Sequence, residues 1–298
     1  MNKTDGVKLA LATAGFSGAA VFINGLVVKA VGDALVFTTL KNLGVALVVA
    51  AMLLSRGVDW RQVRQNWFKL LAIAVIGGSL PFYLFFEGLR QAASVNAALI
   101  HKTLVFWVAL WAIPVLKEKV SLKQLLALGL IFGSNLVIGG YQGLVWGRGE
   151  TMILAATILW AVENVIAKVA LRQVAVDTVV GARMILGSIL LLLATLATGK
   201  MGLIFKLSIG QWGLTAVSVG LLAGYVLSWY RALKQAPVTL VATVLTLATL
   251  VTNGLSAIFV THNLNLGFIY QSVLLVAGAW FFYTEAKRLR DEGRFALR

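Results

Sequence analysis

The chain has 298 residues, of which 60% are hydrophobic and only 12% are charged. Soluble domains carry roughly 45–50% apolar and about 25% charged residues, so this composition excludes an ordinary soluble domain and indicates a chain solvated mainly by lipid. The net charge of +15 does not indicate nucleic-acid binding, because the basic residues lie in short links and tails between apolar runs. With no cysteine and only two histidines, the sequence excludes a disulfide framework and a thiolate or histidine-rich metal site, and no cofactor is expected.

Ten apolar segments follow one another along the chain, and each is long enough as a helix to cross a hydrocarbon core of about 30 Å. Helices are expected because lipid offers the backbone no hydrogen-bond partner and no barrel-like alternation is visible. Residues 1–8 run into the first segment without a small-residue cleavage site, which predicts a retained helix rather than a signal peptide. The predicted spans are 9–30, 34–54, 69–89, 94–116, 122–141, 151–171, 177–198, 211–233, 237–260 and 266–285.

The basic residues of the links predict the orientation of these spans. With the N-terminus in the cytoplasm, seventeen lysines and arginines lie on the cytoplasmic side and five lie outside. This bias follows the positive-inside rule, and an odd number of spans would weaken it. We therefore expect a multi-pass protein of the inner (plasma) membrane with both termini in the cytoplasm.

The second half of the sequence repeats the first. Leu89-Arg90-Gln91-Ala92 recurs as Leu233-Lys234-Gln235-Ala236, 144 residues later, and Asp33 recurs as Asp177 at the same offset. Five spans per repeat force the two halves, residues 1–145 and 146–298, into opposite orientations across a bilayer. Inverted repeats around a central cavity are a common architecture of secondary transporters, with the substrate site between the halves.

The stretch 83–121 carries a family resemblance. Gly88-Leu89-Arg90-Gln91-Ala92-Ala93-Ser94-Val95-Asn96-Ala97-Ala98 precedes an aromatic span, which Leu116-Lys117-Glu118-Lys119 closes before Gln124 opens the next. This pattern resembles the EamA-type repeat of the drug/metabolite transporter superfamily, and the tandem layout covers the whole chain. The resemblance implies ten helices arranged as a basket around a cavity. The aromatic-proline signature of the family's aromatic amino acid exporters is absent from span four, where His101-Lys102-Thr103 stands instead.

Ionisable residues inside membrane spans are costly and are therefore candidates for function. Glu163 lies near the middle of span six and is the first candidate for a substrate site. A carboxylate at that depth must be neutralised, paired or placed in a water-filled cavity. Two interpretations remain open: a proton-carrying site residue, or a structural ion pair with Lys102 or Lys41 that fastens the two halves together.

Lys41 and Lys102 lie too deep in the outer half of spans two and four to reach water easily. If both face one cavity, they create a positive field suited to a carboxylate or phosphate. The alternative is internal pairing with Glu87 and Glu163. His101 titrates near neutral pH, but adjacent helix positions point about 100° apart, so we expect Lys102 rather than His101 to face a ligand.

Two further residues complete the predicted substrate site. Asn164 follows Glu163 and needs a polar partner in lipid, and Trp107 lies close to the ionisable pair of span four and suits an apolar moiety. Lys168 and Arg183 lie near the inner ends of their spans, where we expect long side chains to extend to water. Arg183 also lies in the second span of its repeat, as Lys41 does in the first, so the repeat symmetry leaves a paired role open for it.

Gly77 and Gly78 precede Pro81 in span three and form the clearest hinge candidate. Proline cannot donate a backbone bond to the residue four positions earlier, which here is Gly77, and it kinks a helix. The corresponding region of the second repeat, 220–224, also carries two glycines but no proline. A static kink without hinge motion is the other interpretation.

These observations together predict a secondary transporter that moves small organic metabolites by alternating access. Export of amino acids or related carboxylates, coupled to protons, is the first expectation, and an organophosphate or nucleotide-sugar exchanger is the alternative. A membrane-embedded enzyme would need several histidines and acids at one depth, which the sequence lacks. The expected partners are a small-molecule substrate, membrane lipid and protons, with no nucleic acid, and the expected state is a monomer.

Overall fold

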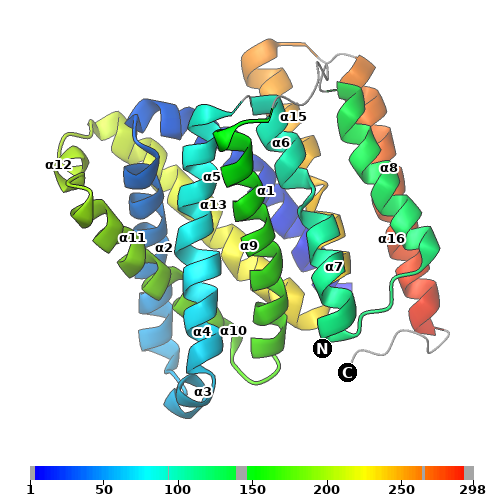
Figure 1. The fold of residues 1–298 in the computed structure, drawn as a ribbon, viewed down its shortest axis with the longest axis horizontal. Helices are drawn as coiled ribbons and strands as arrows, with labels where there is room; N and C mark the ends of the chain where they lie inside the picture. Colours follow the sequence, from blue (N-terminus) through cyan, green and yellow to red (C-terminus); the bar gives the residue numbers. More distant parts are fainter. Residues whose placement is uncertain (1–3, 93, 139–145, 264–265, 292–298) are drawn as a thin grey trace.

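The helices begin and end close to the predicted spans. The computed structural model describes residues 4–92, 94–138, 146–263 and 266–291, and every regular element within them is a helix (Figure 1). The first repeat contains α1 (Thr4–Val31), α2 (Ala34–Arg56), α3 (Trp60–Gln65), α4 (Trp67–Ile73), η1 (Ala74–Ser79), α5 (Leu80–Gln91), α6 (Ser94–Lys102), α7 (Leu104–Leu116) and α8 (Leu122–Ile138). The second contains α9 (Arg148–Ala170), α10 (Val176–Gly181), η2 (Ala182–Leu186), α11 (Gly187–Ala197), α12 (Met201–Ile204), α13 (Ile209–Gln235), α14 (Val238–Leu245), α15 (Ala248–Ser256), η3 (Ala257–Thr261) and α16 (Leu266–Asp291).

Within the described residues, nine helical stretches are long and apolar enough to cross a membrane, and α8 is a tenth, shorter apolar helix. The ten-helix, all-α membrane fold expected from the sequence is therefore confirmed. The predicted end of the fifth span, residues 139–141, lies outside the described residues.

Four of the ten spans are interrupted helices: α4–η1–α5, α6–α7, α10–η2–α11 and α14–α15–η3. In the third span, Pro81 has no N–H to donate to the carbonyl of Gly77, and the chain forms the π-helix η1 at this turn. The indole N–H of Trp160 in α9 donates to that carbonyl at 3.2 Å. The interruption thus leaves the Gly77 carbonyl free to accept a hydrogen bond from a neighbouring span.

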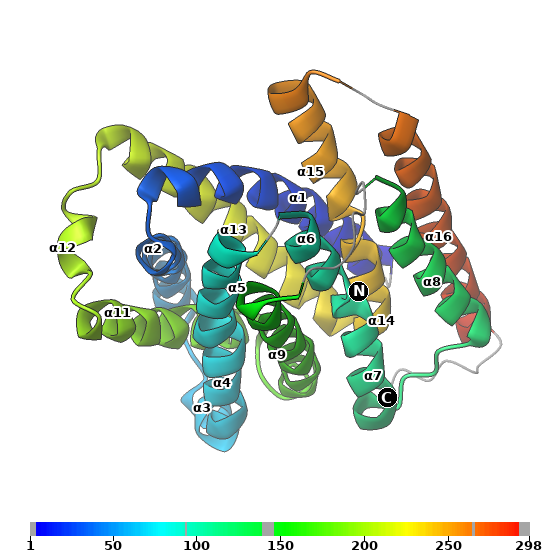
Figure 2. The same cartoon turned by 45° about the horizontal axis from the view of Figure 1, so that its top comes forward.

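Two equivalent spans run antiparallel, which shows that the repeats are inverted. The second span, α2, packs against its counterpart 144 residues later, α10–η2–α11 (Figures 1 and 2). Asp33 before α2 pairs with Lys200 after α11 at 2.7 Å, and Arg56 at the end of α2 pairs with Asp177 in α10 at 2.6 Å. Each ion pair joins the beginning of one span to the end of the other.

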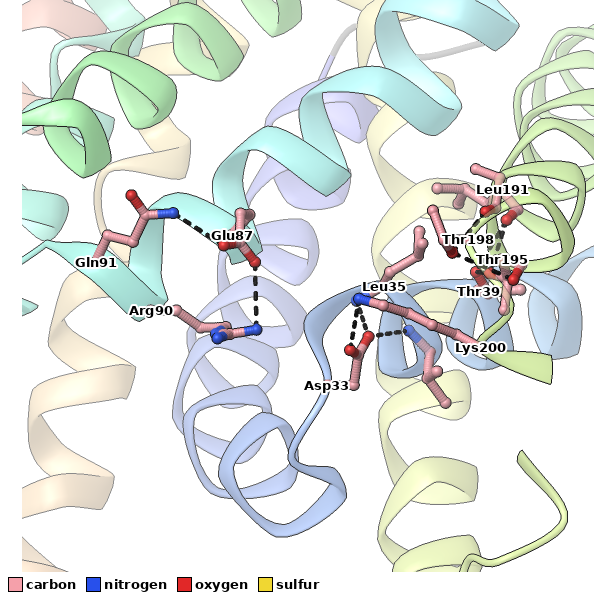
Figure 3. Close-up of polar contacts among 12 residues, drawn as sticks. Asp33, Leu35, Thr39, Glu87, Arg90, Gln91, Leu191, Thr195, Thr198 and Lys200 are labelled. Atoms are coloured by element: carbon pink, nitrogen blue, oxygen red, sulfur yellow. Dashed lines mark hydrogen bonds and ion pairs between the residues drawn. The ribbon is translucent and has the colours of Figure 1, made fainter. Parts of the chain in front are cut away.

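Figure 3 shows the end of this contact that carries Asp33 and Lys200. The Asp33 carboxylate also accepts the backbone N–H groups of Leu35 and Val36 at 2.9 and 3.0 Å, and so caps α2. Burial raises the pKa of Asp33, but the hydrogen bond from Lys200 and the backbone amides outweigh it and hold the pKa below its ordinary value of 3.8. The carboxylate is therefore charged at neutral pH, and the ion pair persists.

The helices α8 and α16 pack mainly on each other and lie at one edge of the bundle in both views (Figures 1 and 2). The Gln271 amide of α16 donates to Asn135 of α8 at 2.9 Å and accepts from Asn253 of α15 at 2.8 Å. Such interhelical bonds satisfy polar groups that lipid cannot. None of the described residues that line the central cavity comes from α8 or α16.

Candidate substrate cavity

A cavity lies between the two repeats, and spans from both halves contribute its walls. The titratable side chains that line it are Lys41 from α2, His101 from α6, Glu163 from α9, Arg183 from η2 and Tyr225 from α13. The rest of the wall is mostly apolar or aromatic and includes Phe82, Phe85, Phe86 and Trp160. Of the charged residues expected to face a common cavity, Lys41 and Glu163 line it and Lys102 does not, while His101 and Arg183 also contribute to its wall.

Glu163 belongs to a buried network of three side chains. Its carboxylate accepts a very short hydrogen bond from the Tyr230 hydroxyl and lies 3.8 Å from the Arg183 guanidinium. Arg183 in turn donates to the Tyr230 oxygen at 3.1 Å. Glu163 and Tyr230 are fully buried and Arg183 is 2% exposed. The second carboxylate oxygen of Glu163 and the Arg183 Nε have no hydrogen-bond partner among the described residues, so the network is not fully satisfied.

This network corrects two expectations. Glu163 pairs with Arg183 rather than with Lys102 or Lys41, and all three members of the network belong to the second repeat, so the pair does not fasten the halves together. Arg183 does not extend to water, because it lies in the π-helix η2, which directs its side chain into the bundle toward α9 and α13. Position along a span indicates depth, but not the direction in which a side chain points.

Lys41 lies in a cage of aromatic rings. Its ammonium is 5.0, 5.3 and 4.5 Å from the ring centres of Phe37, Phe82 and Phe86. The residue is 1% exposed, and no hydrogen bond or ion pair of its ammonium occurs within the described part of the chain. Ring faces attract a cation but do not replace hydrogen-bond acceptors. Lys41 is therefore a buried cation with no acidic partner among the residues that the structure describes.

Span four presents His101 rather than Lys102 to the cavity, which reverses the order expected from the sequence. The His101 ring lies between Phe85 and Trp160, with ring centres 4.9 and 5.4 Å away, and its Nδ1 is 3.4 Å from the Thr157 hydroxyl. Because adjacent helix positions point in different directions, Lys102 lies outside the cavity lining.

Asn164 and Trp107 have partners within the bundle. Asn164 lines the cavity, but its side-chain oxygen accepts the indole N–H of Trp229 at 3.1 Å. Trp107 lies outside the lining and donates to the Thr103 hydroxyl at 3.1 Å. Glu87, the other predicted acidic partner of the lysines, pairs with Arg90 at 3.5 Å instead (Figure 3).

Gly77 and Gly78 make room for the network. A Cβ atom on Gly77 would lie 2.4 Å from Cγ of Glu163, and one on Gly78 would lie 2.2 Å from the carbonyl oxygen of Arg183. Both glycines are therefore required by close packing, and η1 and η2 contact each other here. Their predicted role as a hinge with Pro81 stays a prediction.

Two contacts at helix termini join neighbouring helices at the end of the bundle that carries α3. The Glu118 carboxylate accepts the backbone N–H groups of Val238 and Thr239 at 2.7 and 3.1 Å, which caps α14. The Lys168 ammonium donates to the carbonyl oxygens of Leu233 and Ala236 at the end of α13. Lys168 was expected to extend to water, but these carbonyls give its charge a nearer partner.

Sequence reasoning missed Tyr230 and the aromatic cage of Lys41. Tyr230 carries no charge, so its sequence position gave no reason to separate it from the other aromatic residues of span eight. The cage forms because Phe37 lies one helical turn before Lys41, while Phe82 and Phe86 come from span three. The spacing of Phe37 and Lys41 on one helix face was the visible signal.

Comparison with known proteins assigns the architecture. Residues 4–140 match the EamA-like transporter family, and residues 147–284 match it again. The chain belongs to the EamA-like transporter family. A crystal structure of another protein has the same fold with a TM-score of 0.77 and 18% sequence identity, over 97% of this chain and 99% of that one.

Two relatives named as transporters agree with membership of the EamA-like family. The Bacillus subtilis protein named uncharacterized transporter YyaM is 26% identical over 202 residues, which is 65% of this chain and 66% of that protein. An uncharacterized transporter of Methanothermobacter thermautotrophicus is 25% identical over 142 residues, 46% of this chain and 41% of that protein. The chain is thus a multi-pass membrane transporter.

Proposed function

We propose that this EamA-family transporter exports a small amino acid or related carboxylate by alternating access, with the substrate bound in the central cavity. The observation that carries the proposal is Lys41, a cation that lines the cavity and has no acidic partner in the described residues. A buried charge is expensive unless it is paired. An anionic substrate supplies the missing partner each time it binds.

Glu163 is the proposed proton carrier. Its carboxylate lines the same cavity, and one of its oxygens lacks a hydrogen bond among the described residues. A proton on Glu163 would release Arg183 from its ion pair, and the free guanidinium could then contact the substrate carboxylate. This exchange of partners would couple substrate binding to protonation.

The proposed orientation follows the basic links. The end of the bundle that carries α3 faces the cytoplasm, with both termini on that side of the plasma membrane. The contacts of Glu118 and Lys168 lie at this end. They support a state closed toward the cytoplasm, from which release to the outside would follow. We propose that the monomer is the working unit, because both halves of the cavity come from one chain.

Uptake into proteoliposomes tests the function. Protein reconstituted with an imposed pH gradient should accumulate at least one radiolabelled member of a panel of amino acids and small carboxylates. Lys41→Met should reduce this uptake about tenfold to a hundredfold, because hydrogen bonds to a charged group contribute about 1.5–3 kcal/mol. Lys206→Met, which removes an exposed lysine, should leave uptake unchanged.

The same assay tests proton coupling. Glu163→Gln should remove the dependence of uptake on the pH gradient, while the purified variant still folds. Full activity of Glu163→Gln with an unchanged pH profile would exclude Glu163 from the coupling mechanism, and equal uptake by Lys41→Met would exclude Lys41 as a substrate-binding residue.

A further inference from the structure

The charges of the central cavity do not cancel. Among the described residues, the lining contains four groups that carry or can gain charge near neutral pH: Lys41, His101, Glu163 and Arg183. Glu163 neutralises Arg183 within an ion pair. The His101 ring is packed between Phe85 and Trp160, and no acidic partner among the described residues holds a proton on it. One positive charge remains, on Lys41.

The neighbouring charged groups do not change this balance. Lys102 follows His101 but lies outside the lining, and Glu87 is engaged with Arg90. Lys168 donates to backbone carbonyls at the end of α13. Tyr225 also lines the cavity and stacks on Trp229, with ring centres 5.9 Å apart, and a tyrosine is uncharged at neutral pH.

We propose that the cavity selects a solute that carries one negative charge and an apolar body, such as a monocarboxylate with an aromatic or aliphatic side chain. The inference rests on the proposed transport function and narrows its substrate class. A carboxylate can accept all the N–H bonds that the Lys41 ammonium offers toward the cavity, and its single charge balances the single unpaired cation.

Other charge states fit the cavity less well. While Glu163 is ionised and paired with Arg183, a phosphate dianion would bring a second negative charge into a mostly apolar cavity whose described lining has no second free cation, and that charge would have to be desolvated without a partner. A zwitterion would satisfy Lys41 but would place its ammonium group in a cavity whose described lining offers no free carboxylate, because Glu163 is paired with Arg183. Both should bind more weakly than the matching monoanion.

The aromatic walls and the volume of the cavity limit the kind and the size of apolar group that the substrate can carry. Phe82, Phe85, Phe86 and Trp160 surround the position of Lys41 and His101 with ring faces and edges. The space open to the centre of a water molecule is about 120 Å³. At roughly 10–15 Å³ per water, this is room for a solute on the order of ten non-hydrogen atoms. A nucleotide sugar is several times larger, which argues against that class.

Three probes that share one phenyl ring and differ in charge test the proposal. They are phenylacetate, phenylalanine and phenyl phosphate, which at pH 7 are a monoanion, mainly a zwitterion and mainly a dianion. Binding to the purified full-length protein is measured from the shift of its thermal unfolding midpoint, and uptake is measured in proteoliposomes. Phenylacetate should bind at least tenfold more tightly than the other two and should be taken up fastest.

Variants connect the preference to Lys41. Lys41→Met should weaken phenylacetate binding at least tenfold, and Lys41→Arg, which keeps the charge, should retain part of it. Lys102→Met removes the same charge from a position outside the lining and should change binding less than twofold. The unfolding midpoint of each unliganded variant shows whether it has folded.

Each remaining outcome has a defined meaning. Preferred binding and uptake of phenyl phosphate or phenylalanine would overturn the monoanion preference and leave the proposed transport function standing. Unchanged phenylacetate binding by a folded Lys41→Met variant would overturn the role of Lys41. No uptake of any probe, and of no amino acid or carboxylate in the wider panel, would overturn the proposed function itself.

Discussion

Replacing Arg183 with methionine is expected to lower the free energy of unfolding by about 3–5 kcal/mol. Arg183 is the cationic partner of Glu163, and both side chains are buried. Removal of the cation leaves the buried Glu163 charge with only the hydrogen bond from the Tyr230 hydroxyl to stabilise it. The loss should shrink as the pH is lowered, since a protonated Glu163 carries no charge. Reversible unfolding in mixed micelles measures the effect.

Two control variants separate this effect from general loss of packing. The double variant Glu163→Met with Arg183→Met removes both charges and should regain most of the lost stability, because buried ion pairs are often replaceable by apolar side chains. Arg56→Met breaks the exposed ion pair with Asp177 and should cost only about 0–1 kcal/mol. A double variant as unstable as Arg183→Met would show that the ion pair is not the cause.

Replacing Gly78 with alanine is expected to destabilise the protein by about 1–3 kcal/mol or more and to abolish transport. The added Cβ would lie 2.2 Å from the carbonyl oxygen of Arg183 and 3.2 Å from the Cα of Gly187. Both obstacles are backbone atoms, so no side-chain rotation relieves the clash. The helices η1 and η2 would have to separate, which would displace Arg183 from Glu163. Thermal unfolding and proteoliposome uptake measure the two effects.

Gly220 provides the matched control in the other repeat. A Cβ atom there would meet nothing within 4 Å, and the residue lies inside α13. Gly220→Ala should therefore raise stability by about 0.5–1 kcal/mol, as expected for glycine to alanine in a helix. If Gly78→Ala instead kept full stability and only slowed transport, Gly78 would act as a hinge and not as a packing residue.

Much of the fold could be predicted because a bilayer restricts the options. Apolar runs of about 20 residues must be helices, and the recurrence of Asp33 as Asp177 with five spans per repeat indicated inversion. The interruptions inside spans were harder to predict. Only Pro81 marked one of them, whereas the break after Lys102 and the π-helix η2 follow from tertiary packing that hydropathy does not record.

The residues of the candidate site could also be predicted only in part. Charge and depth identified Glu163 and Lys41, because a buried charge is rare and visible in a sequence. The direction of a side chain around the helix axis is not visible, and so Arg183 was assigned to water and Lys102 to the cavity. The helix η2 changes the helical phase at Arg183, which defeats any estimate based on regular periodicity.

The central claim is that the two halves have opposite orientations across the membrane and enclose the cavity between them. Single cysteines at two exposed positions test it directly, because the natural chain contains none. In intact cells, Lys29→Cys should react with a membrane-impermeant maleimide from outside, and Arg172→Cys should react only after the membrane is opened. Labelling of both positions from the same side would contradict the inverted arrangement and the transport mechanism built on it.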